Sequence, residues 1–244
     1  RNAPGSYQHS LQVANLAEQA ARSIGANAQL TRVGALHHDV GKALQPQYFI
    51  ENQVPGQNIH DQLDPVTSAS IIIQHVTDGL TLARKHRLPP RVQAFISEHH
   101  GTMRTTYQYR NALKLVNGDE EQLDIRDFTY PGPSPQSRET GILMLADSVE
   151  AKARAEKPEN SDEIDDLVRS IIQDRLNGHQ LDDTPLTLRD LTVIRQSFVG
   201  TLKGMYHPRI QYPEAPALQQ DTVPAEQKTI DRGAPHELPD SPQT

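Results

Sequence analysis

One aspartate interrupts an otherwise apolar stretch of this 244-residue chain. The stretch runs from Gly141 through Ile, Leu, Met and Leu to Ala146, and Asp147 follows at once in a segment of helical pattern. An ionised carboxylate inside such a helix is strongly disfavoured unless it is paired or binds a cation. The chain must therefore fold so that a positive charge meets Asp147 in the interior.

Helical periodicity places four histidines on apolar faces as well. They are His9 before Val13, Leu16, Ala17 and Ala20; His38 after Leu30, Val33 and Gly34; His75 after Ile71 and Ile72; and His99 after Val92, Phe95 and Ile96. Most polar side chains of a helix point outward, whereas a metal ligand must point inward. The placement of these histidines therefore favours metal ligation.

A single histidine on an apolar face is more often a core residue that is satisfied by a hydrogen bond. The joint occurrence changes this interpretation, because the pair His38-Asp39 is followed by Gly41-Lys42 and is accompanied by His9, His75, His99, His100 and Asp147. The remaining histidines are expected outside the site. His37 is a packing or supporting residue, His60 lies in a loop, and surface positions are expected for His86, His179, His207 and His236.

The patterns predict helices almost throughout and no alternating strands, so the expected fold class is all-α. The predicted helices cover residues 6–23, 27–39, 64–86, 90–100, 136–156, 161–177 and 187–206. Asp64-Pro65 is a good start signal, with Asp64 as the cap. The region from Met103 to Ser134 is less regular, and the proline-rich stretch from Tyr130 to Pro135 predicts an ordered or lid-like loop.

Composition limits the class of protein. With 35% hydrophobic residues the chain can bury a full core, and the absence of cysteine excludes disulfides and thiolate metal sites. The net charge of −7 argues against a general DNA- or RNA-binding surface. No segment approaches the roughly 18 apolar residues of a membrane span. Because the chain begins with Arg1 and not methionine, we expect a domain excised from a longer protein.

The predicted domain covers residues 1–207, and residues 208–244 form a proline-rich tail that is expected to be disordered. The amphipathic helices after Pro158 are expected to pack beside the metal core. Whether these helices also form the interface of a homodimer is a question that the sequence leaves open.

Six motifs carry a resemblance to a known family. They are Ala3-Pro-Gly-Ser-Tyr-Gln-His9-Ser, His38-Asp-Val-Gly-Lys42, Phe49-Ile-Glu-Asn-Gln53, Glu98-His-His-Gly-Thr102, Tyr130-Pro-Gly-Pro-Ser-Pro-Gln136 and Leu145-Ala-Asp-Ser-Val-Glu150. Over roughly residues 2–213 the chain resembles the cytoplasmic HD domain of the seven-transmembrane HD hydrolases, the family that includes membrane-bound cyclic di-AMP phosphodiesterases. The resemblance implies an HD-domain helical bundle with a dinuclear metal site, in the cytoplasmic part of an integral inner-membrane protein.

The resemblance also implies two divalent metal ions. We assign His9, His38, Asp39 and Asp147 to one ion and Asp39, His75, His99 and His100 to the other, with Asp39 as the bridge. Imidazole with carboxylate suits iron, manganese, zinc or cobalt better than calcium, and iron or manganese is expected here. The implied reaction is hydrolysis of cyclic di-AMP to linear pApA by attack of a metal-bridging hydroxide.

Three further residues are candidates for contact with the substrate. Lys42 follows the His38-Asp39 pair and is expected to help neutralise a phosphate, with a solvated lysine after a helix as the alternative. Thr102 and Arg138 are candidates because they are close in sequence to the site motifs. Tyr107, Tyr109 or Tyr130 can stack on a base, or can simply pack against their neighbours.

Alternatives stay open at this point. The same metals can cleave cyclic di-GMP, linear dinucleotides or another nucleotide phosphate ester, although the chain lacks the Gly-Tyr-Pro signature of the HD-GYP relatives. A non-catalytic cyclic-dinucleotide sensor and a structural helical domain with a bound metal are the other two hypotheses. The intact ligand set argues against a pure sensor, which has no need for a bridged pair of metals.

Overall fold

Helices built from the apolar faces described above make up most of the chain. The computed structural model describes residues 3–54 and 56–206. The predicted disordered tail over 208–244 therefore lies outside the described residues, as do His207 and His236. Within those residues there is no named strand, and an isolated β-bridge joins Arg104 to Thr129. The all-α prediction is confirmed.

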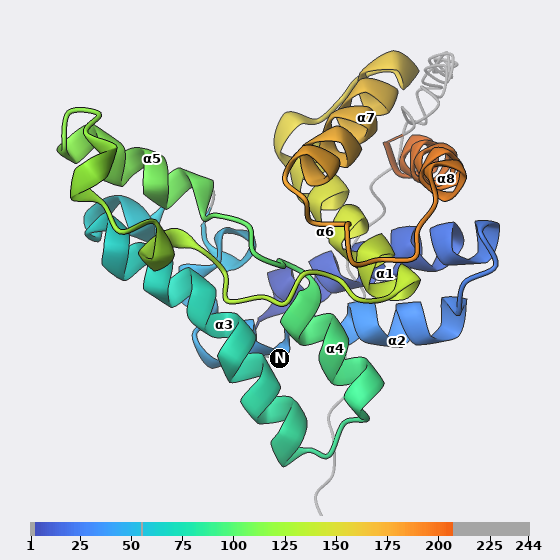
Figure 1. Ribbon diagram of the computed structural model, residues 1–244, viewed down its shortest axis with the longest axis horizontal. Helices are drawn as coiled ribbons and strands as arrows, with labels where there is room; N and C mark the ends of the chain where they lie inside the picture. Colours follow the sequence, from blue (N-terminus) through green and yellow to red (C-terminus); the bar gives the residue numbers. More distant parts are fainter. Residues whose placement is uncertain (1–2, 55, 207–244) are drawn as a thin grey trace, which may run out of the picture. The chain divides into compact units, whose positions relative to one another are not determined.

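Figure 1 shows the order of the helices along the chain, with longer connections between α2 and α3 and between α5 and α6. The α-helices are α1 (Pro4–Ser23), α2 (Ala28–His37), α3 (Pro65–Lys85), α4 (Pro90–Glu98), α5 (Thr106–Leu115), α6 (Arg138–Glu156), α7 (Ser161–Asn177) and α8 (Leu188–Tyr206). Short 3-10 helices are η1 (Val40–Leu44), η2 (Pro46–Tyr48), η3 (Ile50–Asn52), η4 (Ile59–Gln62), η5 (Glu120–Gln122) and η6 (Ile125–Phe128). No helix in the two described ranges is both long enough and apolar enough to cross a membrane.

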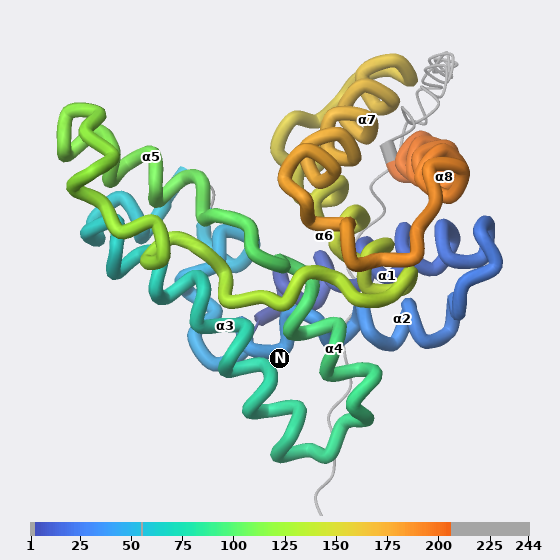
Figure 2. The backbone as a smooth tube through the Cα atoms, in the orientation of Figure 1, coloured from blue at the N-terminus to red at the C-terminus, as the bar shows by residue number. Residues whose placement is uncertain are grey.

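Helix α6 forms the centre of the main hydrophobic core. Every residue from Thr140 to Asp147 is buried, so this segment has no solvent face of its own. It packs against α1, α2, α4 and α7, and Figure 2 shows its path beside α1 and α7. This environment explains why the sequence of α6 is apolar all round, and why Asp147 needs a partner within the fold.

Local signals fix where the helices begin. Asp64 caps α3 as predicted, because its carboxylate accepts hydrogen bonds from the backbone N–H groups of Val66 at 3.1 Å and Thr67 at 2.9 Å. Ser137 begins α6 with a reciprocal capping box to Thr140. Helix α2 ends at His37 and α4 ends at Glu98, slightly earlier than predicted. The His38-Asp39 and His99-His100 pairs therefore lie where helices end.

One prediction about the fold was wrong. The region between Met103 and Ser134 was expected to be less regular and no helix was predicted there, but it contains helix α5. Only Gln108, Tyr109 and Ala112 of α5 are buried, and the helix is polar on average, so its sequence does not stand out as an apolar segment. Its buried face is completed by tertiary contacts in a second small core with Ala69 and Phe128.

Gly41 allows the segment after α2 to lie directly on α3. A β-carbon at Gly41 would come within 1.9 Å of the His75 carbonyl oxygen and 2.7 Å of the Gly79 nitrogen. No side chain can occupy that space without moving backbone. The glycine of the His38-Asp-Val-Gly-Lys42 motif therefore allows η1 to approach α3, and this approach brings Asp39 toward His75.

Candidate metal centre

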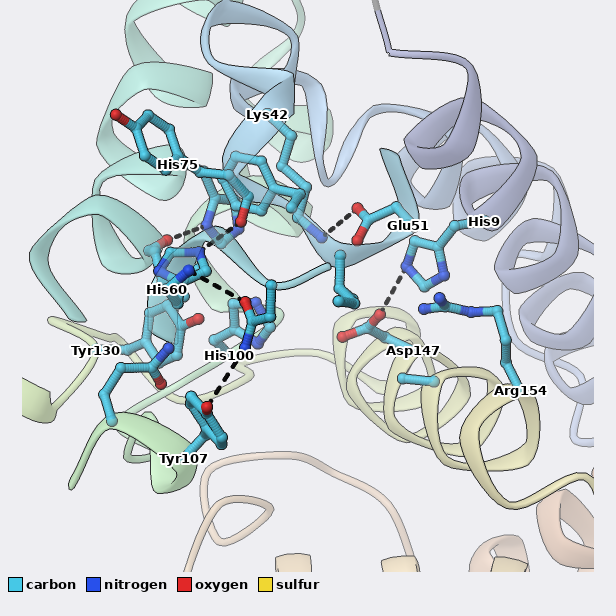
Figure 3. Close-up of a pocket in the computed structure, with 17 residues that line it drawn as sticks. His9, Lys42, Glu51, His60, His75, His100, Tyr107, Tyr130, Asp147 and Arg154 are labelled. Carbon is cyan, nitrogen blue, oxygen red and sulfur yellow. Dashed lines mark hydrogen bonds and ion pairs between the residues drawn. The ribbon is translucent and has the colours of Figure 1, made fainter. Parts of the chain in front are cut away.

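The fold brings the seven predicted ligands to one place from separate elements. His9 comes from α1, His38 and Asp39 from the end of α2, His75 from α3, His99 and His100 from the end of α4, and Asp147 from α6. Six of them are buried, and His100 is half-buried. Figure 3 shows His9 and Asp147 turned toward one another across the site from His75 and His100.

Asp39 lies between two groups of imidazoles. Its Oδ1 atom is 3.4 Å from His75 Nε2 and 3.6 Å from His99 Nε2. Its Oδ2 atom is 3.2 Å from His38 Nε2 and 3.5 Å from His9 Nε2. Each oxygen therefore faces a different pair of ring nitrogens, which is the arrangement required of a carboxylate that bridges two cations.

The two groups match the two sets predicted from the sequence. Asp39, His75, His99 and His100 offer ligand atoms within 4.8 Å of one another, and so do His9, His38 and Asp39. Asp147 belongs beside the second group, because its Oδ1 atom is 3.0 Å from His9 Nε2 and 3.7 Å from His38 Nε2.

Hydrogen bonds at Nδ1 orient the imidazoles. In His38, His75 and His99 the Nδ1 atom lies 2.6, 2.6 and 2.9 Å from the carbonyl oxygen three residues earlier. Since a carbonyl only accepts, Nδ1 must carry the proton and Nε2 is directed into the site. His9 differs, because its Nδ1 lies 2.5 Å from Oε2 of the buried Glu150.

Buried polar atoms without partners test whether a metal fits. Among the described residues, His9 Nε2, His38 Nε2 and both carboxylate oxygens of Asp39 are buried, and their polar neighbours are the other candidate ligands and Lys42 rather than ordinary hydrogen-bond partners. Unsatisfied buried groups are rare in folded proteins because their desolvation is costly. Imidazole nitrogens and carboxylate oxygens that converge in this way are a donor set for divalent transition metals. The residues present therefore fit two such ions.

The group around His9 and His38 is strongly charged without a metal. Burial lowers the pKa of His9, but hydrogen bonds to Asp147 and Glu150 outweigh it and raise this pKa to about 9. Burial also lowers the pKa of His38, but the negative charge of Asp39 opposes this effect and raises that pKa to about 10. Burial also disfavours ionised Asp147, yet hydrogen bonds with His38 and His9 hold its pKa well below the ordinary range. Without a metal ion, the protons on His9 and His38 therefore supply the positive charge in this group.

The other group behaves in the opposite way. Burial lowers the pKa of His99 to about 4, and burial together with the neighbouring His99 holds the pKa of His100 well below its ordinary value. Neutral imidazoles are the form that binds metals. His99 and His100 can therefore accept a cation without losing a proton.

Lys42 lies beside the bridging aspartate. Its Nζ atom is 2.7 Å from Asp39 Oδ2 and 3.2 Å from Glu51 Oε1, and Glu51 also accepts a hydrogen bond from Ser6. Burial would lower the pKa of Lys42, but the charges of Asp39 and Glu51 raise it, so the ammonium stays charged. The structure brings Lys42 to the site, where a phosphate held by the metals would meet a fixed positive charge.

A hollow of about 420 Å³ opens beside these residues. Lys42, His75, His100 and Asp147 line one part of it, and much of the remainder is apolar or aromatic, formed by Tyr48, Phe49, Ile50, Ile72, Tyr107, Tyr130 and Ala151. Tyr130 stacks on His100, with ring centroids 4.2 Å apart. Tyr109 is buried in the second core, so packing is the correct interpretation for that tyrosine.

Thr102 and Arg138, the other two predicted substrate contacts, lie in different places. Thr102 is exposed and borders a second hollow, where its backbone N–H donates to Gln180 Oε1. Arg138 lines neither hollow, and its guanidinium bonds to the Ile24 carbonyl and Asp190. Asp147 lies nine positions after Arg138 on α6, which is about 14 Å along a helix. Proximity in sequence is a poor guide over that distance.

The sequence interpretation missed three residues that support the site. Glu150 lies one turn after Asp147 on α6, so helical spacing could have identified it. Glu51 lies within one of the quoted motifs. His60 was expected in a loop, but it is buried at the hollow, where it bonds to Ser68 Oγ and the Tyr48 carbonyl. No local pattern marks such a contact.

Comparison with known proteins agrees with this geometry. The profile of the HD domain matches residues 6–152. This chain belongs to the HD domain family. The cyclic-di-AMP phosphodiesterase PgpH of Bacillus subtilis (strain 168) is 46% identical over 212 residues, which cover 87% of this chain and 29% of that protein. PgpH of Listeria monocytogenes is 42% identical over 212 residues, again 29% of its length. The chain thus spans less than a third of these relatives.

Two solved structures share the fold of this HD domain. The crystal structure of the L. monocytogenes PgpH HD domain has a TM-score of 0.79 and 39% sequence identity, and the match covers 84% of this chain and 95% of that one. The same domain in complex with cyclic-di-AMP has a TM-score of 0.80 and 39% identity, with 86% and 96% covered. The resemblance indicated by the six motifs is confirmed.

Proposed function

We propose that this HD domain is a metal-dependent phosphodiesterase that hydrolyses cyclic di-AMP to linear pApA. The observation that carries the proposal is the position of Asp39, with each carboxylate oxygen facing a separate pair of imidazoles. A sensor or a structural metal site has no need of a bridged pair of ions. The match to an HD domain that was solved with cyclic-di-AMP supports the choice of substrate.

In this proposal His9, His38, Asp39 and Asp147 would hold one ion, and Asp39 would share the second with His75, His99 and His100. When bound, such a pair of divalent ions lowers the pKa of water and neutralises charge on a phosphate. Iron or manganese is the expected metal, and a homodimer and a membrane-spanning parent protein remain predictions. The HD domain is proposed to extend over residues 1–207.

The side chains around the metals would bind and orient the substrate. Lys42 holds a charged ammonium beside Asp39, where it would pair with a non-bridging phosphate oxygen. The aromatic wall of the hollow offers stacking to a base, mainly through Tyr107, whose hydroxyl is fixed by Asp61 at 2.5 Å. Asn58 and Gln108 also line the hollow and present amides that can bond to a base edge.

The decisive experiment is hydrolysis of cyclic di-AMP and cyclic di-GMP side by side. The protein is loaded anaerobically with ferrous iron or with manganese, and the linear product is followed by chromatography. We expect faster cleavage of cyclic di-AMP, and its loss in Asp39→Ala but not in Asp166→Ala, which changes an exposed aspartate of α7. Binding without turnover, at full metal occupancy, would instead indicate a sensor.

A further inference from the structure

A second hollow of about 870 Å³ lies next to the first. The two share several lining residues, among them His100, Tyr130 and Asp147. The candidate metal centre is therefore at the junction of two hollows and not at the end of one. A substrate bound at the centre can extend into both.

The second hollow is the more polar of the two and carries three cations. Arg104, Lys152 and Arg175 line it, but Lys152 is already engaged, because its Nζ atom donates to Ser170 Oγ at 2.8 Å and lies 3.9 Å from Glu156. Two acidic side chains, Asp147 and Asp174, also contribute to the lining. Guanidinium and ammonium groups commonly bind phosphate.

Arg175 is the cation best placed for this role. It is half-buried on α7, and its Nη2 atom donates a hydrogen bond of 2.8 Å to Ser148, the residue next to Asp147. Among the described residues it has no carboxylate within ion-pair distance, and its buried Nε has no partner. By contrast, Arg169 on the same helix is paired with Asp165 at 2.6 Å.

An unpaired guanidinium that is partly removed from water is costly unless an anion meets it. Burial lowers the pKa of Arg175, whereas Asp147 and Asp174 raise it. Asp147 itself points toward His9, at 3.0 Å, and so is not the partner. The guanidinium therefore keeps donors free toward the hollow.

We propose that Arg175 binds the second phosphate of the cyclic dinucleotide, the one that is not cleaved. This inference rests on the proposed function. A cyclic dinucleotide carries two phosphates in one ring, so when one lies at Asp39 and Asp147 the other lies within the same site. Arg175, oriented by Ser148, meets it from the second hollow.

The position of Arg175 in the chain gives the proposal a consequence for specificity. The HD profile matches residues 6–152, and α7 begins at Ser161. The metal ligands thus lie within the matched region, whereas Arg175 comes from a helix beyond it. The metals recognise any phosphodiester, and Arg175 selects esters that carry a second phosphate.

The test compares two substrates on the metal-loaded protein. Cyclic di-AMP has a second phosphate, and bis(4-nitrophenyl) phosphate is a simple phosphodiester without one. We expect Arg175→Gln to raise the KM for cyclic di-AMP by about 10- to 100-fold, the effect of one charged hydrogen bond to phosphate. Cleavage of bis(4-nitrophenyl) phosphate should stay within about twofold, which is the usual range for a site that the ligand does not touch. Arg169→Gln, the matched control on α7, should leave both substrates unchanged.

Other results overturn the proposal. Equal losses on both substrates would mean that Arg175 supports the fold or the metals, and unchanged KM values would mean that it does not touch the substrate. If Arg175→Gln does not fold, Arg175→Lys is compared in the same way, since it keeps the charge but loses the planar fork. If the parent protein does not cleave cyclic di-AMP, the proposed function fails separately, and Kd values for cyclic di-AMP from calorimetry then decide the role of Arg175. Absence of all binding by the parent refutes both proposals.

Discussion

The hydrogen bond between His9 and Glu150 distinguishes one imidazole from the others. His38, His75 and His99 donate Nδ1–H to backbone carbonyls, whereas His9 meets a buried carboxylate at 2.5 Å. A carboxylate partner makes an imidazole a stronger metal ligand and fixes its orientation. Glu150 is therefore expected to strengthen only the ion held by His9.

Glu150→Gln tests this inference because it removes the charge and keeps the size and one acceptor. Supporting residues of this kind change metal affinity by about 10- to 100-fold. That change corresponds to about 1.4 to 2.7 kcal/mol. The affinity for the ion between His75 and His99 should change much less, because Glu150 contacts His9 and Arg154 and neither residue of that pair.

The assay is a titration of metal-free protein with manganese, in which the free ion is counted by electron paramagnetic resonance. The parent should bind two ions, and the variant should bind one with unchanged affinity and one more weakly. Glu156→Gln is the matched control, since Glu156 is an exposed glutamate on the same helix. Equal weakening of both ions, or no weakening of either, would refute the reasoning, provided that the melting temperatures agree.

Three further predictions follow from the same geometry. Gly41→Ala should lower stability by about 1 to 3 kcal/mol through overpacking against α3, measured by denaturant unfolding. Gly200→Ala, where the new methyl meets nothing within 4 Å, should not lower it. Lys42→Met should reduce kcat/KM by about 10- to 100-fold through loss of a charged contact, with metal content unchanged. Metal binding should release protons, because His9 and His38 have pKa values of about 9 and 10 without metal and are protonated at neutral pH. Affinity should then fall as the pH is lowered, and calorimetric heats that do not depend on the ionisation enthalpy of the buffer would contradict this.

The sequence predicted the parts of the site that obey local rules. His9, His75, His99 and Asp147 each lie on an apolar helical face, and such faces must meet in a core, so their convergence was predictable without any distance. Gly41 was identified in a motif, but its steric role required the position of α3.

The parts that were missed depend on partners far away in the chain. Glu150 meets a histidine 141 residues earlier, and His60 is defined by its bonds to Tyr48 and Ser68. Helix α5 gains its buried face only when Phe128 covers it. Arg138 shows the reverse case. It was expected at the site because it is close to the motifs in sequence, but a helix places such residues well apart in space.

The stability of the domain without metal separates a catalytic centre from a structural one. The main hydrophobic core is built by residues of α1, α2, α4, α6, α7 and α8, and none of its members is a metal ligand. Protonated His9 and His38 also pair with Asp39 and Asp147 when no metal is present. Both features should keep the metal-free domain folded.

Chelation should therefore lower the melting temperature without unfolding the domain at 25 °C. A metal present at 100 times its dissociation constant adds about 2.7 kcal/mol to the free energy of unfolding, and chelation should remove about that amount. For a domain of this size, this is a fall of roughly 5 to 11 °C. Near-ultraviolet circular dichroism measures whether tertiary packing persists. Loss of that signal on chelation would mean that the ions hold the fold together, because an apolar core that is sufficient by itself does not need them.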